Sequence, residues 1–319
     1  MPSENSSAPS NPTSREHITV AAIGKPDIAL QVQRPESGIS HTDVVYVHGG
    51  TFGADLSIYC PFDGRSWADN LVAAGFAVWG FDFVGYGKSA RYCADMGRPA
   101  GDIDDAMHDL RRVIESIRER NGNRPAVLLA HSRGAAVAAR YAGEYPSDVS
   151  ALVLFAPIVK RSEPVAASAA RTELPSHLPL SAWAQYRRFI EDVPRGQPQV
   201  LSEAHMQTWG DAFLASDPTS SQRTPPSVMT PCGPLADIGA LWCGEALYDP
   251  AKVTAPTLIV RGEWDSVCTD ADARSLLDAL CSRTKEDVKV PRATHLMHLE
   301  QQRSALYLEV ERFIQKVLS

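Results

Sequence analysis

The 319-residue sequence lacks the features that mark several classes of protein. No apolar run approaches the ~20 residues that a helix needs to cross a bilayer. The six cysteines include no C-x-x-C pair and no accompanying histidine pair, which excludes the common zinc-site patterns. The net charge is −7 and no basic stripe is present, so neither a nucleic acid nor an anionic membrane surface is an expected partner.

The first residues also lack apolar side chains. Residues 1–15 are rich in Ser, Pro and Asn, and such a segment cannot bury enough surface to offset the entropy of ordering it. We therefore expect a disordered tail, and one without the apolar segment of a secretory signal. The whole chain is 44% hydrophobic, so a large core can form without disulfides, and we expect reduced cysteines and a cytoplasmic location.

Short apolar runs alternate with helical periodicity along the rest of the chain. A turn at Gly24 joins two alternating segments, which predicts an antiparallel hairpin at one edge of a sheet. A helix is predicted over residues 102–120, since Leu110, Val113 and Ile117 share one face. Buried strands are predicted at residues 43–48, 77–82, 127–130, 149–158, 256–261 and 287–290. Strands separated by helices require parallel crossovers, so we predict an α/β fold with a mostly parallel sheet flanked by helices.

The sequence around Ser132 predicts a sharp turn between a buried strand and a helix. The strand ending at Ala130 runs into Ala-His-Ser132-Arg-Gly134, followed by an alanine-rich helical run. This is the G-x-S-x-G nucleophile elbow with alanine in place of the first glycine. A serine there projects its hydroxyl above the strand end, at a helix N-terminus that favours negative charge. The alternative is that Ser132 only caps the helix.

Asp265 and His295 also follow directly on predicted strands, at the edge where parallel sheets bind ligands. A serine hydroxyl needs a base, which His295 would supply, and an acid to orient that base, which Asp265 would supply. The chain order of serine, acid and histidine is the one that accompanies the nucleophile elbow. No acid follows the 149–158 strand, which favours Asp265 further. The rival acids and the rival base are Glu263, Asp270, Asp272 and His298.

A glycine-rich loop, His48 to Gly53, follows the first buried strand. Acyl transfer requires two backbone N–H groups that already point at the developing oxyanion. We expect one from Arg133, directly after the serine, and the other from Gly50, with Thr51 or Phe52 as alternatives. The other interpretation is a plain turn that uses glycine for its backbone freedom.

Over residues 159–249 prolines cluster and the strand pattern stops. Short helices are predicted at residues 181–191, 202–215 and 235–246. We interpret this region as a mainly helical cap inserted into a core of residues 16–158 and 250–319.

Candidate substrate contacts come from the cap and from the neighbours of the predicted catalytic residues. The tryptophans of the cap would line an acyl pocket or pack the cap onto the core. Arg187 and Arg188 would bind an acidic substrate group or form a solvated helix face. The candidate pocket residues are Thr51, Phe52, His131, Trp183, Trp209 and Trp242.

Together these motifs resemble the α/β-hydrolase family, over residues 18–318. The resemblance implies a cofactor-free, metal-free hydrolase that acts through an acyl-enzyme on an ester, thioester or lactone with a medium-sized apolar acyl part. A C–C bond hydrolase or an acyltransferase on the same triad is an alternative, and a non-catalytic receptor of this fold is an alternative from another class. The expected partner is a small-molecule substrate, and a homodimer is among the assemblies left open.

Overall fold

An eight-stranded sheet runs through the computed structural model, which describes residues 15–38, 40, 42–162 and 174–319. The spatial order is β1-β2-β4-β3-β5-β6-β9-β10. All neighbours from β4 to β10 are parallel, and β1–β2 and β2–β4 are antiparallel, which confirms the predicted mostly parallel sheet. The strands are β1 (Glu16–Ala22), β2 (Lys25–Gln33), β3 (Asp43–Val47), β4 (Ala77–Phe81), β5 (Ala126–His131), β6 (Val149–Phe155), β9 (Thr257–Gly262) and β10 (Lys285–Val290).

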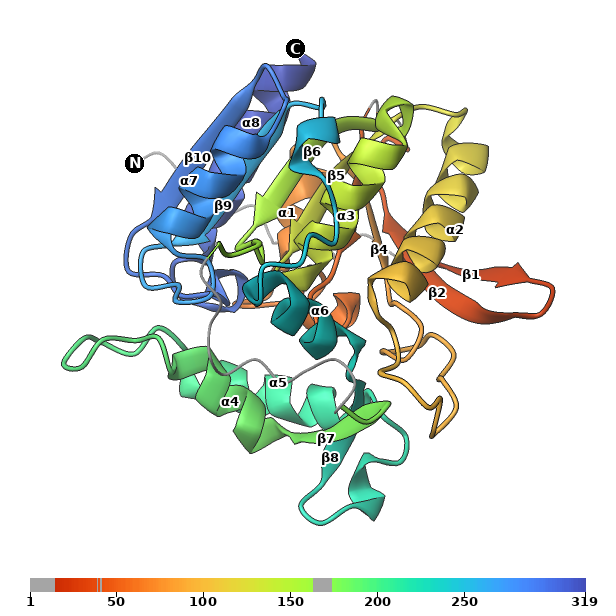
Figure 1. Ribbon diagram of the computed structural model, residues 1–319, viewed down its shortest axis with the longest axis vertical. Coiled ribbons are helices and arrows are strands. Elements are labelled where there is room, and N and C mark those ends of the chain that lie inside the picture. The colour runs from red at the N-terminus through yellow and green to blue at the C-terminus, as the bar shows by residue number, and fades with distance from the viewer. Residues whose placement is uncertain (1–14, 39, 41, 163–173) are drawn as a thin grey trace, which may run out of the picture.

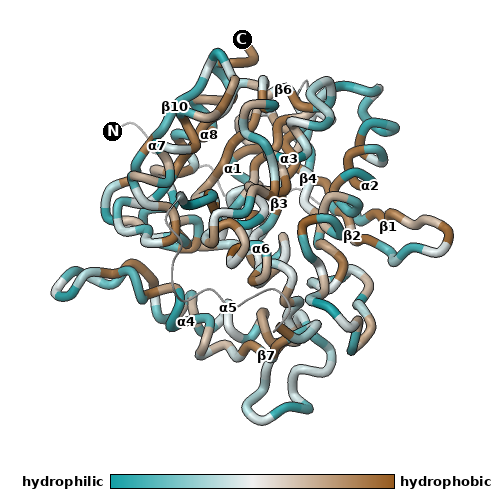
Figure 2. Tube along the Cα trace, in the orientation of Figure 1, coloured by the Kyte–Doolittle hydropathy of each residue, from teal (hydrophilic) through white to brown (hydrophobic). Residues whose placement is uncertain are grey.

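Helices cover both faces of this sheet (Figure 1). One apolar cluster joins the sheet to α2, α3 and α7, and a second joins the opposite face to α1 and α8. Figure 2 shows hydrophobic residues concentrated on the central strands between these helices. The helices are α1 (Trp67–Ala73), α2 (Ile103–Asn121), α3 (Arg133–Glu144), α7 (Asp270–Ala279) and α8 (Arg303–Leu318).

Local capping fixes where these helices begin. Ser66 and Asp69 form a reciprocal capping box at α1, and Thr269 and Asp272 form another at α7, as their spacing predicts. The side chain of Asp102 accepts two backbone N–H groups at the start of α2. Each such cap stabilises its helix by about 1 kcal/mol. Helix starts are therefore determined locally, ahead of any tertiary packing.

We call residues 174–249 the cap segment; the preceding part of the expected cap, residues 163–173, lies outside the described residues. Its three predicted helices are present, and Figure 1 shows α4 and α5 beyond one end of the sheet, with α6 nearer the core. A two-stranded antiparallel sheet, β7–β8, was not predicted, because each five-residue strand contains a proline and lacks clean alternation. The elements are β7 (His177–Ser181), α4 (Ala182–Ile190), α5 (Glu203–Ala215), β8 (Ser227–Pro231) and α6 (Gly233–Trp242).

A third apolar cluster joins the cap segment to the loop after β3. The ring of Phe52 packs edge-on against Trp209, with centroids 5.2 Å apart, and Phe189 packs against Trp209 at 5.0 Å. The indole N–H of Trp209 donates to the Leu56 carbonyl at 2.9 Å. Burying each such ring stabilises the contact by roughly 2–3 kcal/mol. The cap segment therefore fixes the position of the glycine-rich loop.

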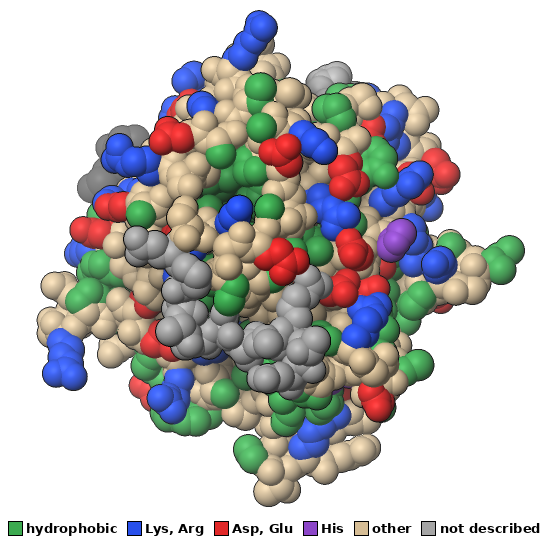
Figure 3. All heavy atoms as spheres, viewed as in Figure 1, with side chains coloured by type: hydrophobic (Ala, Val, Ile, Leu, Met, Phe, Trp, Pro, Cys, Tyr) green, Lys and Arg blue, Asp and Glu red, His purple; other side chains and the backbone are tan. Residues whose placement is uncertain are grey.

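One face of the molecular surface carries both signs of charge. On the face in Figure 3, acidic and basic side chains are interspersed. No helix in the described part of the chain combines the length and apolarity needed to cross a membrane.

Candidate active site

Ser132 occupies a strained turn between β5 and α3. Its backbone has φ 56° and ψ −124°, a left-handed conformation that is rare for a residue with a side chain and is typical of the nucleophile elbow. Gly134 makes the turn sterically feasible, because a Cβ there would lie 2.3 Å from the His48 carbonyl oxygen. Ala130 is fully buried between β3 and β6, where its methyl group is accommodated. The departure from the glycine pattern therefore leaves the elbow intact.

Ser132, His295 and Asp265 form a continuous hydrogen-bonded chain. The Nε2 atom of His295 lies 2.8 Å from Ser132 Oγ, and its Nδ1 atom lies 3.1 and 3.2 Å from the two carboxylate oxygens of Asp265. Asp265 also accepts the backbone N–H groups of Val267 and Cys268, at 2.9 and 3.0 Å. All three side chains are buried. The carboxylate is therefore held against Nδ1, which leaves Nε2 as the atom that can take the serine proton.

The rival residues are engaged elsewhere. Glu263 is exposed and accepts the Arg292 N–H, Asp270 pairs with Arg261 and Lys289, and Asp272 caps α7. His298 lies in a short 3-10 helix, Met297–Leu299, which precedes the final helix α8. Its ring packs among Phe52, His131 and Phe155, away from any carboxylate contact in the described chain. Burial lowers the pKa of His298 to about 3, so it stays neutral at physiological pH.

The ring of His131, the residue before Ser132, forms a hydrogen bond to the backbone of His295. The Nε2 atom of His131 donates to the His295 carbonyl at 3.1 Å. Burial holds the pKa of His131 well below its ordinary value, so the ring remains neutral. Its Nδ1 atom is buried without a hydrogen-bond partner among the described residues and therefore remains an acceptor beside Ser132.

Two side chains orient the glycine-rich loop. His48 donates from Nδ1 to the Gly49 carbonyl at 2.8 Å and accepts the Phe83 N–H at Nε2, at 3.0 Å. Burial lowers the pKa of His48 to about 3, which preserves this neutral tautomer. The Tyr86 hydroxyl donates to the Gly50 carbonyl at 2.8 Å. Because a trans peptide points C=O and N–H in opposite directions, these bonds fix the directions of the Gly50 and Thr51 N–H groups.

Arg133 has a second contact that the elbow motif does not predict. Its guanidinium is buried and bonds the Asp237 carboxylate of α6 from Nε at 2.9 Å and from Nη2 at 2.7 Å. Nη2 also donates to the Gly101 carbonyl at 2.7 Å, and Asp237 accepts the Ile103 N–H at 3.2 Å. The residue that follows the nucleophile is thus tied to the cap segment. No local signal identifies Asp237, which lies more than 100 residues from its partner.

The triad opens onto a small pocket of about 30 Å³, room for about one water molecule. Several residues expected from the sequence line it: Gly50, Thr51, Phe52, His131, Ser132 and His295. The remaining wall comes mainly from the cap helices α4 and α6; of its residues, only Arg188 was considered as a substrate contact from the sequence. The additional lining residues are Gly49, Arg188, Phe189, Pro234, Leu235, Ile238 and Leu296.

None of the three candidate tryptophans lines the triad pocket, which corrects their expected role. Trp183 is 67% exposed and stacks on Tyr186. Trp209 packs the cap segment onto the loop after β3, and Trp242 packs against the guanidinium of Arg161 at 4.3 Å. Aromatic content alone does not tell which cap face a residue occupies, so the sequence could not make this distinction.

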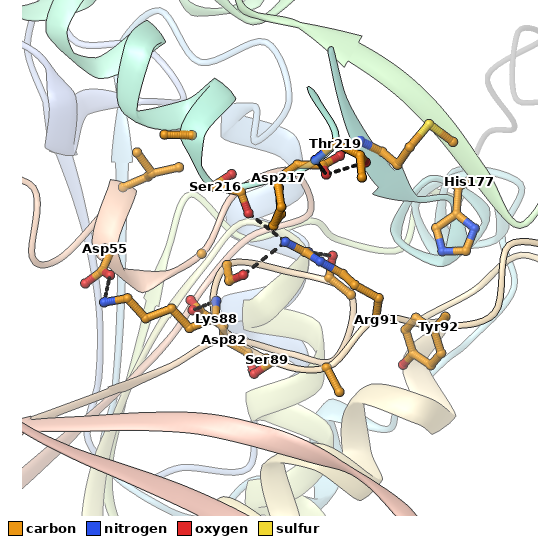
Figure 4. A pocket seen from close by; sticks show the side chains of 18 of the residues that line it. Asp55, Asp82, Lys88, Ser89, Arg91, Tyr92, His177, Ser216, Asp217 and Thr219 are labelled. Atoms are coloured by element: carbon orange, nitrogen blue, oxygen red, sulfur yellow. Dashed lines mark hydrogen bonds and ion pairs between the residues drawn. The ribbon is translucent and has the colours of Figure 1, made fainter. Parts of the chain in front are cut away.

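A much larger cavity, of about 1,000 Å³, lies between the loop after β4 and the cap segment (Figure 4). In this view the Arg91 side chain crosses from that loop toward Ser216, whose carbonyl it binds at 2.6 Å. The loop after β3 separates the two spaces, since Phe52 lines the triad pocket whereas Leu56 lines the large cavity. The described residues contain no cluster of three or more His, Cys, Asp or Glu side chains arranged to hold a metal ion.

A mostly parallel sheet with a serine, histidine and aspartate hydrogen-bonded at its carboxyl edge is the architecture of the α/β-hydrolases. Residues 44–302 match the model of the family described as serine aminopeptidase, S33, and the chain belongs to this family. The expectation of an α/β-hydrolase enzyme is therefore confirmed.

Three individual relatives share a quarter or less of their residues with this chain. The chain is 25% identical to a monoacylglycerol lipase of Mycolicibacterium smegmatis over 293 residues, which is 90% of this chain and 91% of the relative. The monoacylglycerol lipase of Paleococcus ferrophilus superimposes with a TM-score of 0.59 at 18% identity, covering 92% of this chain and 99% of that structure. A thioesterase domain from the curacin biosynthetic pathway gives 0.63 at 17% identity, covering 93% and 100%. At these identities the structural matches show the fold alone.

Proposed function

We propose that the protein is a serine hydrolase that cleaves a carboxylic ester through an acyl-enzyme. The observation that carries this proposal is the 2.8 Å contact between Ser132 Oγ and His295 Nε2, with Asp265 bonded to Nδ1. His295 takes the hydroxyl proton as Ser132 Oγ attacks the carbonyl carbon, and Asp265 stabilises the resulting imidazolium. The C–O bond to the alcohol then breaks, and His295 passes its proton to the departing oxygen.

The second half of the reaction returns the enzyme to its starting state. Water attacks the acyl carbon and gives one proton to His295, the bond to Ser132 Oγ breaks, and Oγ recovers the proton from His295. The Arg133 N–H and an N–H of the loop, from Gly50 or its neighbour Thr51, would stabilise the oxyanion in both halves. The fixed carbonyls of Gly49 and Gly50 support this assignment, because they keep the loop donors oriented before substrate arrives.

Two observations favour an ester over a peptide with a free amino terminus. The relatives that span nearly the whole chain include monoacylglycerol lipases. The described residues of the pocket lining include no carboxylate that would bind an ammonium group, and they include the cationic side chain of Arg188. A thioester or lactone would be attacked by the same groups.

The small pocket has a consequence for substrate entry. A volume of about 30 Å³ does not hold an acyl chain, so a cap helix must shift to admit one. We propose that residues 159–249 act as this cap over a catalytic core of residues 16–158 and 250–319. The apolar side chains Phe189, Leu235 and Ile238 would then contact the acyl part.

Labelling with a fluorophosphonate probe tests the proposal. We expect the wild-type protein to form an adduct at Ser132, located by mass spectrometry, and the Ser132→Ala variant to form none. Ser147→Ala, which changes an exposed serine on the surface, serves as the matched control and should label normally. Hydrolysis of p-nitrophenyl esters should follow the same pattern. A wild-type protein that neither labels nor hydrolyses esters would favour the receptor alternative.

A further inference from the structure

We propose that Arg188 binds an anionic group, a carboxylate or a phosphate, on the substrate. The proposal rests on the proposed function, because it assigns a substrate class to the same pocket. Arg188 lies near the C-terminal end of α4 and lines the pocket that contains Ser132 and His295. Among the described residues that line this pocket, Arg188 is the one lysine or arginine, and no aspartate or glutamate lines it.

The guanidinium of Arg188 is under-used within the protein. Among the described residues it makes one hydrogen bond, from Nη1 to the Gln185 side-chain oxygen at 3.3 Å, although a guanidinium carries five N–H donors. No carboxylate of the described residues forms an ion pair with it, and Glu191 acts on it only from a distance. The buried or nearly buried guanidinium groups of Arg133 and Arg261 each have a carboxylate partner. Arg188 therefore has donors available for a ligand.

The surroundings of Arg188 suit anion binding. Arg188 is exposed, yet nearby protein atoms displace part of the water around its guanidinium and lower its pKa. The guanidinium is therefore accessible from solvent and also borders the triad pocket, where a ligand can reach it. An opposite charge is attracted more strongly there than in bulk water, and its arrival would offset the cost of holding an unpaired cation.

The neighbouring Arg187 provides a natural comparison. Both side chains are exposed on the same helix, but Arg187 does not line the triad pocket. The two adjacent arginines therefore have different predicted roles, with Arg188 recognising substrate and Arg187 forming a solvated surface. This role for Arg188 would distinguish the protein from a lipase that acts on neutral glycerides, because a neutral glyceride has no anionic group for a guanidinium to bind.

Three esters of equal length test the proposal: p-nitrophenyl hexanoate and its ω-carboxylate and ω-phosphonate analogues. A charge-assisted hydrogen bond contributes enough that we expect wild-type kcat/KM for at least one anionic ester to exceed that for the neutral ester by about 10- to 100-fold. The two anionic esters distinguish a carboxylate from a phosphate as the preferred group. Arg188→Met should reduce the anionic-to-neutral ratio to about 1, Arg188→Lys should retain part of it, and Arg187→Met should leave it unchanged.

The outcomes separate the two proposals. If the wild type labels at Ser132 and hydrolyses all three esters equally, the proposed function stands and the role of Arg188 is overturned. The same holds if Arg188→Met and Arg187→Met change the ratio alike. If the protein neither labels nor hydrolyses any of the esters, the proposed function fails and this proposal fails with it. Because the readout is a ratio within each variant, a partial loss of folded protein does not mimic the expected result.

Discussion

Two cavities meet the cap segment, and the smaller one contains the residues that we propose to be catalytic. The triad pocket has about 30 Å³ of space and the cavity of Figure 4 about 1,000 Å³. In the small pocket a nucleophile, a base and an unpaired cation face one space. In the large cavity the acidic groups are already used: Asp55 pairs with Lys88 and Arg15, and Asp217 pairs with Arg223.

The comparison teaches that volume is a poor guide to function in this molecule. Asp82 lines the large cavity, but its carboxylate accepts the backbone N–H groups of Ala54 and Lys88 and so holds two loops together. The partners of Asp82 are backbone N–H groups. The partner of Asp265 is the imidazole of His295, which in turn contacts the Ser132 hydroxyl. Convergent geometry, and not empty space, marks the active site.

The largest expected effect separates the two cavities directly. Ser132→Ala should reduce kcat/KM for an ester by roughly 10⁴-fold or more, because the triad acts as a unit. Ser216→Ala, in the wall of the large cavity, should leave it within about threefold, since its hydroxyl only bonds the Phe213 carbonyl. Steady-state kinetics on both variants checks this, and comparable losses would mean that catalysis does not depend on Ser132.

The next effect concerns the acids of the two cavities. Asp265→Asn should lower kcat by roughly 10³- to 10⁴-fold with folding preserved, because an amide no longer stabilises the imidazolium or selects its tautomer. Asp55→Asn should change kcat little, because its ion pairs lie at the large cavity. Kinetics with circular dichroism as a folding control measures both. A normal kcat for Asp265→Asn would return Glu263 or another acid to consideration.

Stability should show the same asymmetry. Asp237→Asn leaves the buried Arg133 guanidinium without its counter-charge, so we expect the free energy of unfolding to fall by about 3–5 kcal/mol. Asp55→Asn breaks ion pairs at a half-exposed position and should cost about 1 kcal/mol or less. Urea denaturation of both variants gives the comparison. Equal losses would show that the Arg133 pair is no more important than a surface pair.

The two regions should also respond to pH with opposite signs. Burial raises the pKa of Glu300, next to the triad, from 4.5 to about 7, so its contribution to stability is lost as pH rises between these values. Hydrogen bonds from the Met229 and Thr219 N–H groups lower the pKa of Asp217 from 3.8 to about 2, so its contribution is lost as pH falls through that window.

Replacing either carboxyl group by an amide should therefore remove its own contribution to the pH dependence of the free energy of unfolding. Relative to wild type, Glu300→Gln should flatten the decline between pH 5 and 7, an effect of up to roughly 3 kcal/mol for a shift of this size. Asp217→Asn should lower the free energy of unfolding above about pH 4, and its difference from wild type should disappear as pH falls from about 4 to 2. Denaturant titrations at a series of pH values would contradict the assignment if Glu300→Gln and wild type gave parallel curves.

The sequence predicted the catalytic edge well and the cap poorly, for a physical reason. Buried parallel strands are short apolar runs, and residues that follow them meet at one edge, so Ser132, Asp265 and His295 could be brought together without a structure. Helix starts were equally local, as Ser66 and Thr269 show. These signals act over a few residues each.

The pocket wall depends instead on contacts between distant segments. Pro234 of α6 packs against Gly50: a Cβ added at Gly50 would lie 2.9 Å from the Pro234 side chain. No sequence pattern near either residue predicts that contact. Arg188 and Arg187 are adjacent and chemically identical, so only the orientation of α4 distinguishes them. The tryptophans failed as pocket markers because burial and pocket lining favour the same residue type.

Because Arg133 forms an ion pair with Asp237 of α6, displacing α6 should cost more free energy than displacing α4. Pulling α6 outward would separate two desolvated charges, whereas pulling α4 outward would separate only apolar surfaces such as that of Phe189. The helix that is easier to displace is also the one that carries Arg188. We therefore expect α4, and not α6, to be the cap helix that shifts when a substrate enters the triad pocket.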